Sequence, residues 1–356
     1  MIITITRMTT MKRHYTLHFT IVLSLFLGAC SKESPVAPAE DYTTNPPSGA
    51  VLKTTVVKNT GSTVEFEADI VLFDGSSHSI TSRKSKDFNI LSKWSHDILN
   101  GVTSRDSVFL RFAQSEFSTN YMQEEQPYSA VLLLDQSGSI LSTDPRNARI
   151  DAATTFLGAV DSTDYVLLSA FSQGGRLKHE PVTYWGSFTS DGSSFYEAAQ
   201  SLKNLIGGGT PLYLSAYSMT SFLADSAPTP NKALILFTDG QDTEGHLNPD
   251  DVIDHANLLG VKIFTVGLGD GTDRTLLGMI AHQTSGAFMQ TSDAQQLISF
   301  YGSLGNILRG RAYFYRIRWT VSRSNGIFAP GTSLITSVIV SLPKSLTLQI
   351  PLYIEL

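Results

Sequence analysis

Between residues 127 and 310 the sequence alternates short apolar runs with segments that have helical spacing. The apolar runs are Ala130–Leu134, Tyr165–Phe171, Ala233–Thr238 and Val261–Gly267. Runs of this kind, apolar at consecutive positions, indicate strands that are buried on both faces, as in parallel sheets covered by helices. The pattern therefore predicts an α/β fold with a doubly wound, mostly parallel sheet.

The segments between these runs are predicted to be helices because their apolar residues recur every three or four positions. In the first of them, Ala148, Ala152 and Phe156 lie on one face. We expect a short strand at Ala287–Gln290. We expect helices over Arg146–Val160, Phe195–Leu205, Leu212–Leu223, Pro249–Leu259, Asp273–Gln283 and Asp293–Leu308.

Two segments that flank this region, residues 51–126 and 311–356, have strand patterns, and no convincing helix is expected between residues 50 and 120. Each flank is too small to bury a good core alone. We expect the two flanks to pair into one β-sandwich with the α/β region inserted in a loop, and the alternative is two independent β appendages. The expected strands are Val51–Lys58, Val64–Phe73, Val108–Ala113, Ala312–Ser322, Leu334–Ser341 and Leu346–Glu355.

Residues 1–29 have the features of a bacterial lipoprotein signal peptide. Basic residues at positions 12–14 precede the apolar stretch Phe19–Leu27, which is too short to span a bilayer. The following Leu-Gly-Ala-Cys30 resembles a lipobox and contains the only cysteine of the chain. We therefore expect Cys30 to be acylated as the new N-terminus and to anchor the protein to a membrane. The alternative is an ordinary secretory signal in which Cys30 is incidental.

The next segment, residues 30–50, is rich in Pro, Ser and Ala and predicts a tether between the lipid anchor and the folded part. Ser31 directly after the acylated cysteine is compatible with sorting to the outer membrane. We therefore expect a lipid-anchored protein of the bacterial cell envelope, at the outer membrane.

The charge of the chain argues against a nucleic-acid partner. Lys and Arg number 26 and Asp and Glu number 32, which gives a net charge of −6. These charges are spread along the sequence without a basic run, whereas phosphate binding needs clustered Lys and Arg.

Side chains with oxygen atoms follow two of the apolar runs and one run of three glycines. Asp135, Ser137 and Ser139 come at alternate positions after the first buried strand, Thr210 follows three glycines, and Asp239 follows another buried strand. Open α/β sheets bind ligands at the carboxyl ends of their strands, and hard divalent cations prefer oxygen ligands. Alone, the DxSxS run is equally compatible with a polar strand-to-helix loop, but together with Thr210 and Asp239 it favours a divalent-metal site at this edge.

In this order, the DxSxS run, the threonine and the second aspartate resemble the metal-ion-dependent adhesion site of the von Willebrand factor type A family. All five positions are matched, and the resemblance covers residues 127–310. It implies that Ser137, Ser139 and, in the ligand-bound form, Thr210 contact the ion directly. It also implies that Asp135 and Asp239 act largely through bound water. Mg²⁺ is the expected ion, and Mn²⁺ or Ca²⁺ would also suit oxygen ligands.

A cation held in this way stays under-neutralised, so an acidic residue of a partner can complete its coordination shell. We therefore expect a binding protein that recognises a protein or surface ligand. The segment Ile140–Ser142 lacks the acidic residues that give integrin β domains a neighbouring metal, so one metal is expected. The alternatives are an assembly component of an envelope complex with a structural metal and, least favoured, a metal-dependent hydrolase.

Other candidate motifs are incomplete or have a simpler explanation. The histidines form no HExxH pair, and QSGSI is not a GxSxG nucleophile elbow, so neither zinc nor serine-hydrolase chemistry is indicated. Asp242 and Glu244 are interpreted as a solvated acidic loop, with a role at the rim of the metal site as the alternative. Aromatic residues in the segment 171–191 suggest adhesion, but a plain β-hairpin is favoured.

Overall fold

The computed structural model describes residues 40–43, 45–100, 107–122, 125–269, 271–291 and 294–356. Residues 40–356 form one compact unit. The predicted signal peptide, Cys30 and most of the predicted tether lie outside the described residues. Within the described ranges, no helix is long and apolar enough to cross a membrane.

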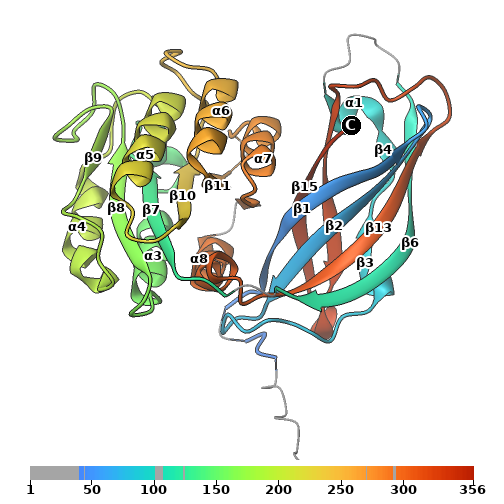
Figure 1. The fold of residues 1–356 in the computed structure, drawn as a ribbon, viewed down its shortest axis with the longest axis horizontal. Helices are drawn as coiled ribbons and strands as arrows, with labels where there is room; N and C mark the ends of the chain where they lie inside the picture. The colour runs from blue at the N-terminus through green and yellow to red at the C-terminus, as the bar shows by residue number, and fades with distance from the viewer. Residues whose placement is uncertain (1–39, 44, 101–106, 123–124, 270, 292–293) are drawn as a thin grey trace, which may run out of the picture. The chain divides into compact units, whose positions relative to one another are not determined.

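The middle of the chain forms the predicted α/β fold, and its strands have the order β12-β11-β10-β7-β8-β9. All neighbours in this series are parallel except β9, which pairs antiparallel with β8. The prediction of a doubly wound, mostly parallel sheet is therefore confirmed (Figure 1). The strands are β7 (Tyr128–Asp135), β8 (Tyr165–Phe171), β9 (Val182–Tyr184), β10 (Asn231–Thr238), β11 (Val261–Leu268) and β12 (Phe288–Thr291).

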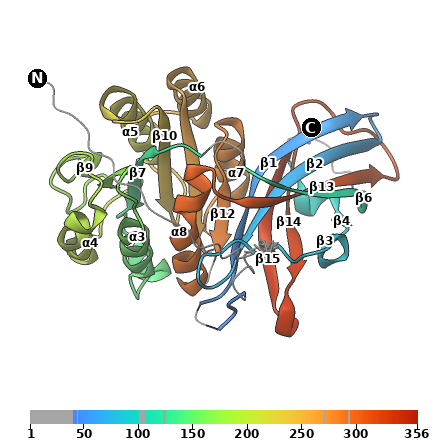
Figure 2. The ribbon, with the colours of Figure 1, turned by 60° about the horizontal axis from the view of Figure 1, so that its bottom comes forward.

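Helices cover both faces of this sheet, because its central strands are apolar at consecutive positions and bury both faces. Helix α3 packs against α8, and α5 packs against α6. Figure 2 shows the sheet between these two pairs. The helices are α2 (Ile140–Thr143), α3 (Ala148–Gly158), α4 (Tyr196–Ser201), α5 (Leu212–Ser226), α6 (Pro249–Leu259), α7 (Arg274–Gln283) and α8 (Ala294–Arg309).

Two of the predicted helices are shorter than expected. The first begins at Ala148, because the carboxylate of Asp144 accepts hydrogen bonds from the backbone N–H groups of Ala148 and Arg149 and so caps the helix there. The predicted helix Phe195–Leu205 is reduced to α4, with a 3₁₀ turn on each side.

The two β-rich flanks interleave in space. Strand β13, from the C-terminal flank, lies between β2 and β6 of the N-terminal flank, and β14 pairs with β3, β5 and β15. Figure 1 shows β13, in orange, between β2, in blue, and β6, in green. The elements are β1 (Ser48–Asn59), β2 (Thr63–Phe73), β3 (Phe88–Ile90), β4 (Lys93–Trp94), α1 (Ser95–Ile98), β5 (Leu99–Asn100), β6 (Phe109–Tyr121), β13 (Tyr313–Arg323), β14 (Ser333–Ser341) and β15 (Thr347–Glu355).

These flanking strands enclose a hydrophobic core of their own. Phe66, Tyr315, Trp319 and Ile350 are among its fully or almost fully buried side chains, and the Phe66 and Trp319 rings stack with their centroids 6.0 Å apart. Among the described residues between 50 and 120, the structure has a single-turn helix, α1, and a 3₁₀ turn at Ser85–Asp87, so the expectation of no helix there is wrong at these two short segments.

The α/β sheet and the flanking strands are continuous with one another through β12 and β1. Strand β1 pairs with β12 at a single register position, Val51 opposite Phe288, so that eleven strands follow one another in one sheet. Beyond Val51, β1 leaves β12.

Candidate metal site

The first candidate residue, Asp135, ends strand β7 and is fully buried. Its Oδ1 accepts a hydrogen bond from the backbone N–H of Ser137 at 2.8 Å, and its Oδ2 accepts one from the hydroxyl of Thr238 at 2.7 Å. Because β7 and β10 are parallel neighbours in register, the ends of both strands come together at this carboxylate.

Two serine hydroxyls continue the cluster toward the second aspartate. The Ser137 and Ser139 Oγ atoms are 3.1 Å apart, and the Ser139 hydroxyl donates to Oδ1 of Asp239 at 2.8 Å. The hydroxyl of Thr143 donates to the other Asp239 oxygen. Four of the five predicted residues therefore share one hydrogen-bonded group of oxygen atoms.

The loop that carries Thr210 lies directly against the DxSxS loop. The backbone N–H of Gly138 donates to the Gly208 carbonyl at 2.9 Å, and the Gly207 N–H donates to the Gln136 carbonyl at 2.8 Å. Thr210 is buried, and its hydroxyl forms no hydrogen bond with the part of the chain that the structure describes. The hydroxyl is therefore available to a ligand.

Glycine is required at position 208 of this loop. Its φ of +87° is in the left-handed region, and a Cβ there would lie 2.2 Å from the carbonyl oxygen of Gln173. The glycine run thus allows the Thr210 loop to pack closely on its neighbours.

A buried ion pair stabilises both loops. The distance between Nη1 of Arg149 and Oδ2 of Asp144 is 2.8 Å, and both side chains are buried. The other Nη of Arg149 donates to Oε1 of Gln136 at 3.1 Å. Because the Gln136 carbonyl accepts the hydrogen bond from Gly207, Arg149 links the start of α3 to the contact between the two loops.

Burial raises the pKa of Asp135 to about 6, and the neighbouring charge of Asp239 adds to the effect. Hydrogen bonds from Ser137 and Thr238 oppose this rise without cancelling it. Two carboxylates held together in a buried place repel each other, and a bound cation would remove that repulsion. The site is thus electrostatically suited to a positive ion.

The donor set fits a hard divalent cation. It consists of two carboxylates and three hydroxyls, with oxygen as the only ligating element. Among the residues whose placement is described, no group of three or more His, Cys, Asp or Glu could hold a metal. Ser137, Ser139 and Thr210 would hold an ion here, with Asp135 and Asp239 supplying negative charge.

Two threonines of this cluster, Thr143 and Thr238, were not predicted from the sequence. Thr143 lies one helical turn after Ser139, a spacing that indicates proximity only once α2 is known. Thr238 directly precedes Asp239 at the end of a buried strand, and its hydroxyl could have been read as a partner for a neighbouring strand end.

The acidic residues beyond Asp239 lie on the rim of this cluster. Asp242 accepts hydrogen bonds from the backbone N–H groups of Tyr213 at 3.2 Å and of Gly245 at 2.7 Å, so it shapes its own loop. A Cβ on Gly209 would lie 2.1 Å from Oε1 of Glu244, which places that carboxylate beside the Thr210 loop. The loop is therefore more than a solvated acidic segment.

The interpretation of the segment 171–191 can also be compared with the structure. In the segment 171–191, β9 forms an antiparallel hairpin with β8, and Tyr184 packs on Phe222 of α5 with the ring centroids 4.9 Å apart. The hairpin interpretation is confirmed.

A comparison with protein families identifies the class of this region. Residues 130–302 match the model of the von Willebrand factor type A domain, just under half of the chain. The chain therefore contains a von Willebrand factor type A domain, as the resemblance implied. No curated protein sequence matches the chain.

Several solved structures are similar in fold. One is the pilus adhesin SpaC from Lactobacillus rhamnosus GG, with 11% identity, 87% of this chain and 48% of that chain covered, and a TM-score of 0.44. Another is proximal thread matrix protein 1 from the mussel byssus, with 18% identity, 60% and 50% covered, and a TM-score of 0.40. A von Willebrand factor type A protein from Catenulispora acidiphila has 12% identity, 88% and 74% covered, and a TM-score of 0.42.

The chain spans about half the length of the adhesin and of the mussel protein. One structure of the mussel protein is described as having a zinc-occupied MIDAS motif. With TM-scores below 0.5, these similarities add no evidence on function.

Proposed function

We propose that this protein binds a protein partner or surface ligand through a divalent cation held by Ser137, Ser139, Thr210, Asp135 and Asp239. The observation that carries the proposal is the oxygen cluster itself. Ser139 joins the two carboxylate-bearing loops at 2.8 Å, and the Thr210 loop is hydrogen-bonded to the same loop. Domains of the von Willebrand factor type A class typically mediate adhesion and interaction rather than catalysis, which supports a binding role.

The chemistry of the cluster explains why an acidic partner group would be recognised. Asp135 already accepts hydrogen bonds from Ser137 and Thr238, and Asp239 accepts them from Ser139 and Thr143. Carboxylates engaged in this way neutralise a cation incompletely, so a bound ion can accept a further carboxylate oxygen from a partner. The chain's hydroxyls orient the ion, and its carboxylates set the charge.

The proposal also specifies the ion that is bound and the location of the protein in the cell. Mg²⁺ is the proposed ion because the donor set is made of oxygen atoms, and Mn²⁺ or Ca²⁺ can replace it. The proposed location is the bacterial envelope, at the outer membrane, through an acyl anchor on Cys30. The support for this is the lipobox-like sequence before Cys30.

Metal binding is tested by calorimetric titration of the full-length protein with MgCl₂ and MnCl₂. We expect one ion per chain for the wild type, and loss of binding in Asp239→Ala. The matched control is Asp254→Ala, an exposed carboxylate in α6, which should bind the ion as the wild type does. Equal binding by the Asp239 and Asp254 variants would contradict the metal site.

Partner binding is tested by immobilising the wild type and Asp239→Ala and exposing both to the same envelope extract. We expect proteins that are retained by the wild type in Mg²⁺, released by EDTA, recaptured when Mg²⁺ is restored, and not retained by Asp239→Ala. Retention that is unchanged by EDTA and by the substitution would mean that the metal site does not mediate binding.

A further inference from the structure

The α/β sheet and the flanking strands separate on one side of the point where β1 meets β12. Strand β12 pairs with β11 only from Thr265 onward, so Val261–Phe264 of β11 have no β12 residue beside them. On the other side, β1 meets β12 only at Val51 and then diverges. The space between β1 and the first half of β11 is lined on its other sides by the C-terminal ends of α7 and α8, and it forms a cavity of about 580 Å³.

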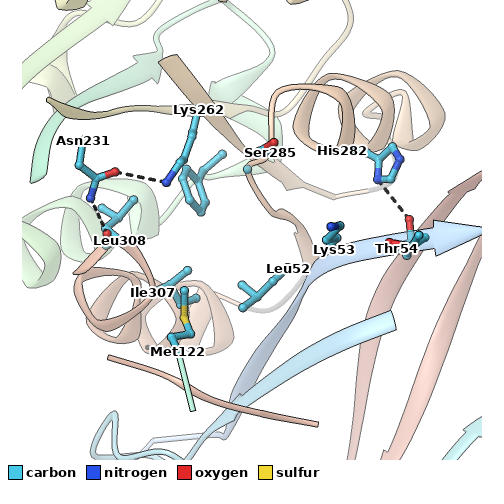
Figure 3. Close-up of a pocket in the computed structure, with 13 residues that line it drawn as sticks. Leu52, Lys53, Thr54, Met122, Asn231, Lys262, His282, Ser285, Ile307 and Leu308 are labelled. Carbon is cyan, nitrogen blue, oxygen red and sulfur yellow. Dashed lines mark hydrogen bonds between the residues drawn. The ribbon is translucent and has the colours of Figure 1, made fainter. Parts of the chain in front are cut away.

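One part of the wall of this cavity is apolar. Phe264, Ile307 and Leu308 are buried in the core of the α/β domain, and Leu52 and Met122 pack against that core. These side chains come from β11, α8, β1 and the residue that follows β6. Figure 3 shows Leu52, Met122, Ile307 and Leu308 facing the same space. The volume lies in the range of small-molecule sites, which is about 300–1,000 Å³.

The remaining wall carries positive charge. Lys53 and Lys262 both line the cavity and are exposed, and neither forms an ion pair within the described residues. Of the described residues that line the cavity, none is an Asp or Glu. Figure 3 shows Lys262 and Lys53 on different sides of the cavity. The cavity therefore has two cationic groups whose charge the chain itself does not neutralise there.

Two neutral side chains, those of Asn231 and Thr54, form hydrogen bonds in the wall of the cavity near these lysines. Asn231 accepts a hydrogen bond from the Lys262 amine at 3.3 Å and donates one to the Leu308 carbonyl at 2.9 Å. The Thr54 hydroxyl donates to the Tyr353 carbonyl at 2.9 Å, so its oxygen accepts from Nδ1–H of His282 at 3.1 Å.

The His282 ring adds no positive charge of its own at neutral pH. Burial lowers its pKa, and the nearby charge of Lys53 lowers it further, although Glu355 acts in the opposite direction. The positive charge of the cavity therefore comes from Lys53 and Lys262.

We propose that this cavity is a second ligand site, which binds an anionic amphiphile: a carboxylate with an apolar tail, of the kind represented by a medium-chain fatty acid. The apolar wall accepts the tail, and burial of the tail supplies most of the affinity. Lys53 and Lys262 form ion pairs with the carboxylate. Because both lysines are exposed to solvent, these ion pairs add little affinity, and their main effect is to favour an anionic head group over a cationic one.

This site is separate from the oxygen cluster. Asn231 is the first residue of β10 and Lys262 is the second of β11, so the cavity lies at the amino ends of the strands, whereas Asp135 and Asp239 lie at the carboxyl ends. Binding in the cavity is therefore expected to be the same with Mg²⁺ and with EDTA. Failure of the metal site would leave this proposal standing.

The test compares two probes that share a tail and differ in head-group charge. Decanoate and decyltrimethylammonium are titrated into the full-length protein, both at concentrations below those at which they form micelles. We expect decanoate to bind with one molecule per chain, and at least about tenfold more tightly than the cation. Equal affinities, or no binding of decanoate, would overturn the proposal.

Variants then locate the site. In the double variant Lys53→Glu/Lys262→Glu, we expect the order of the two affinities to reverse, so that decyltrimethylammonium binds more tightly than decanoate. Binding of the cation also shows that this variant keeps its cavity. The matched control is Lys58→Glu, an exposed lysine of β1 outside the cavity, which should leave both affinities unchanged. Leu52→Trp, which fills the cavity, should weaken both probes, and undiminished binding there would overturn the assignment.

Discussion

Replacement of Asp135 by asparagine should separate the cost of burying this carboxylate from its use in metal binding. The change is nearly isosteric. The asparagine oxygen can accept the hydrogen bond from the Ser137 N–H, and the Thr238 hydroxyl can turn toward the Gly240 carbonyl, which lies 3.3 Å away. The variant therefore removes the charge and leaves the loop its hydrogen-bonding partners.

The magnitude follows from the pKa of Asp135. A rise from 3.8 to about 6 means that the folded, metal-free protein holds this proton more tightly than the unfolded chain does. The free energy of unfolding therefore falls as the pH rises from about 4 to above 6, by about 3 kcal/mol for two pKa units. Asparagine does not ionise, so Asp135→Asn lacks this loss.

The assay is urea unfolding of both proteins in EDTA at pH 4 and pH 7.5. Titrating groups that do not interact with Asp135 cancel in the difference between the wild type and Asp135→Asn. That difference should shift by about 3 kcal/mol in favour of the variant at pH 7.5. At pH 7.5 saturating Mg²⁺ should stabilise the wild type and have little effect on the variant. A difference that is the same at both pH values would refute the electrostatic reasoning.

Three further predictions concern the candidate metal site and the residues that support it. Arg149→Met should lower the free energy of unfolding by about 3–5 kcal/mol in urea, because it leaves the buried Asp144 carboxylate unpaired. Gly208→Ala should destabilise the fold by about 1–3 kcal/mol and weaken Mg²⁺ binding in calorimetry, because a Cβ would collide with the Gln173 carbonyl; unchanged affinity would argue against the loop's role. Mg²⁺ affinity should fall about tenfold per pH unit below about pH 6, as the ion competes with the Asp135 proton, and a flat profile would contradict this.

The α/β fold was predictable because its signals are local. The run Val131–Leu134 is fully buried, as its uninterrupted apolar sequence indicated, and α6 has the predicted bounds. Helix α6 was well defined because Asn248 caps it and Gly260 ends it in a left-handed conformation. The helix expected over Phe195–Leu205 is much shorter, since apolar spacing does not distinguish an α-helix from 3₁₀ turns.

The candidate site was predictable to the extent that it lies at strand ends. Asp135 and Asp239 directly follow buried strands, so a parallel sheet places them at one edge. The contribution of Thr143 was not visible, because it depends on a short helix whose start the sequence did not indicate. The ion pair of Arg149 with Asp144 was not predicted either, because no sequence pattern indicates that an arginine is buried.

The cavity between β1 and β11 had no signal in the sequence. It exists because β1 leaves β12 after the single pairing of Val51 with Phe288, two residues more than two hundred positions apart. Lys53 and Lys262 look like ordinary exposed residues of their strands until that divergence places them around one space. Pairing between such distant segments is not determined by local propensity.

The most direct test of the metal site is an anomalous difference map from crystals of the full-length protein grown with MnCl₂. We predict a single strong peak in contact with the hydroxyl oxygens of Ser137 and Ser139, close to Asp135 and Asp239. Crystals of Asp239→Ala grown in the same solution should lack this peak. A wild-type map without a peak among these residues, or with its strongest peak elsewhere, would contradict the assignment.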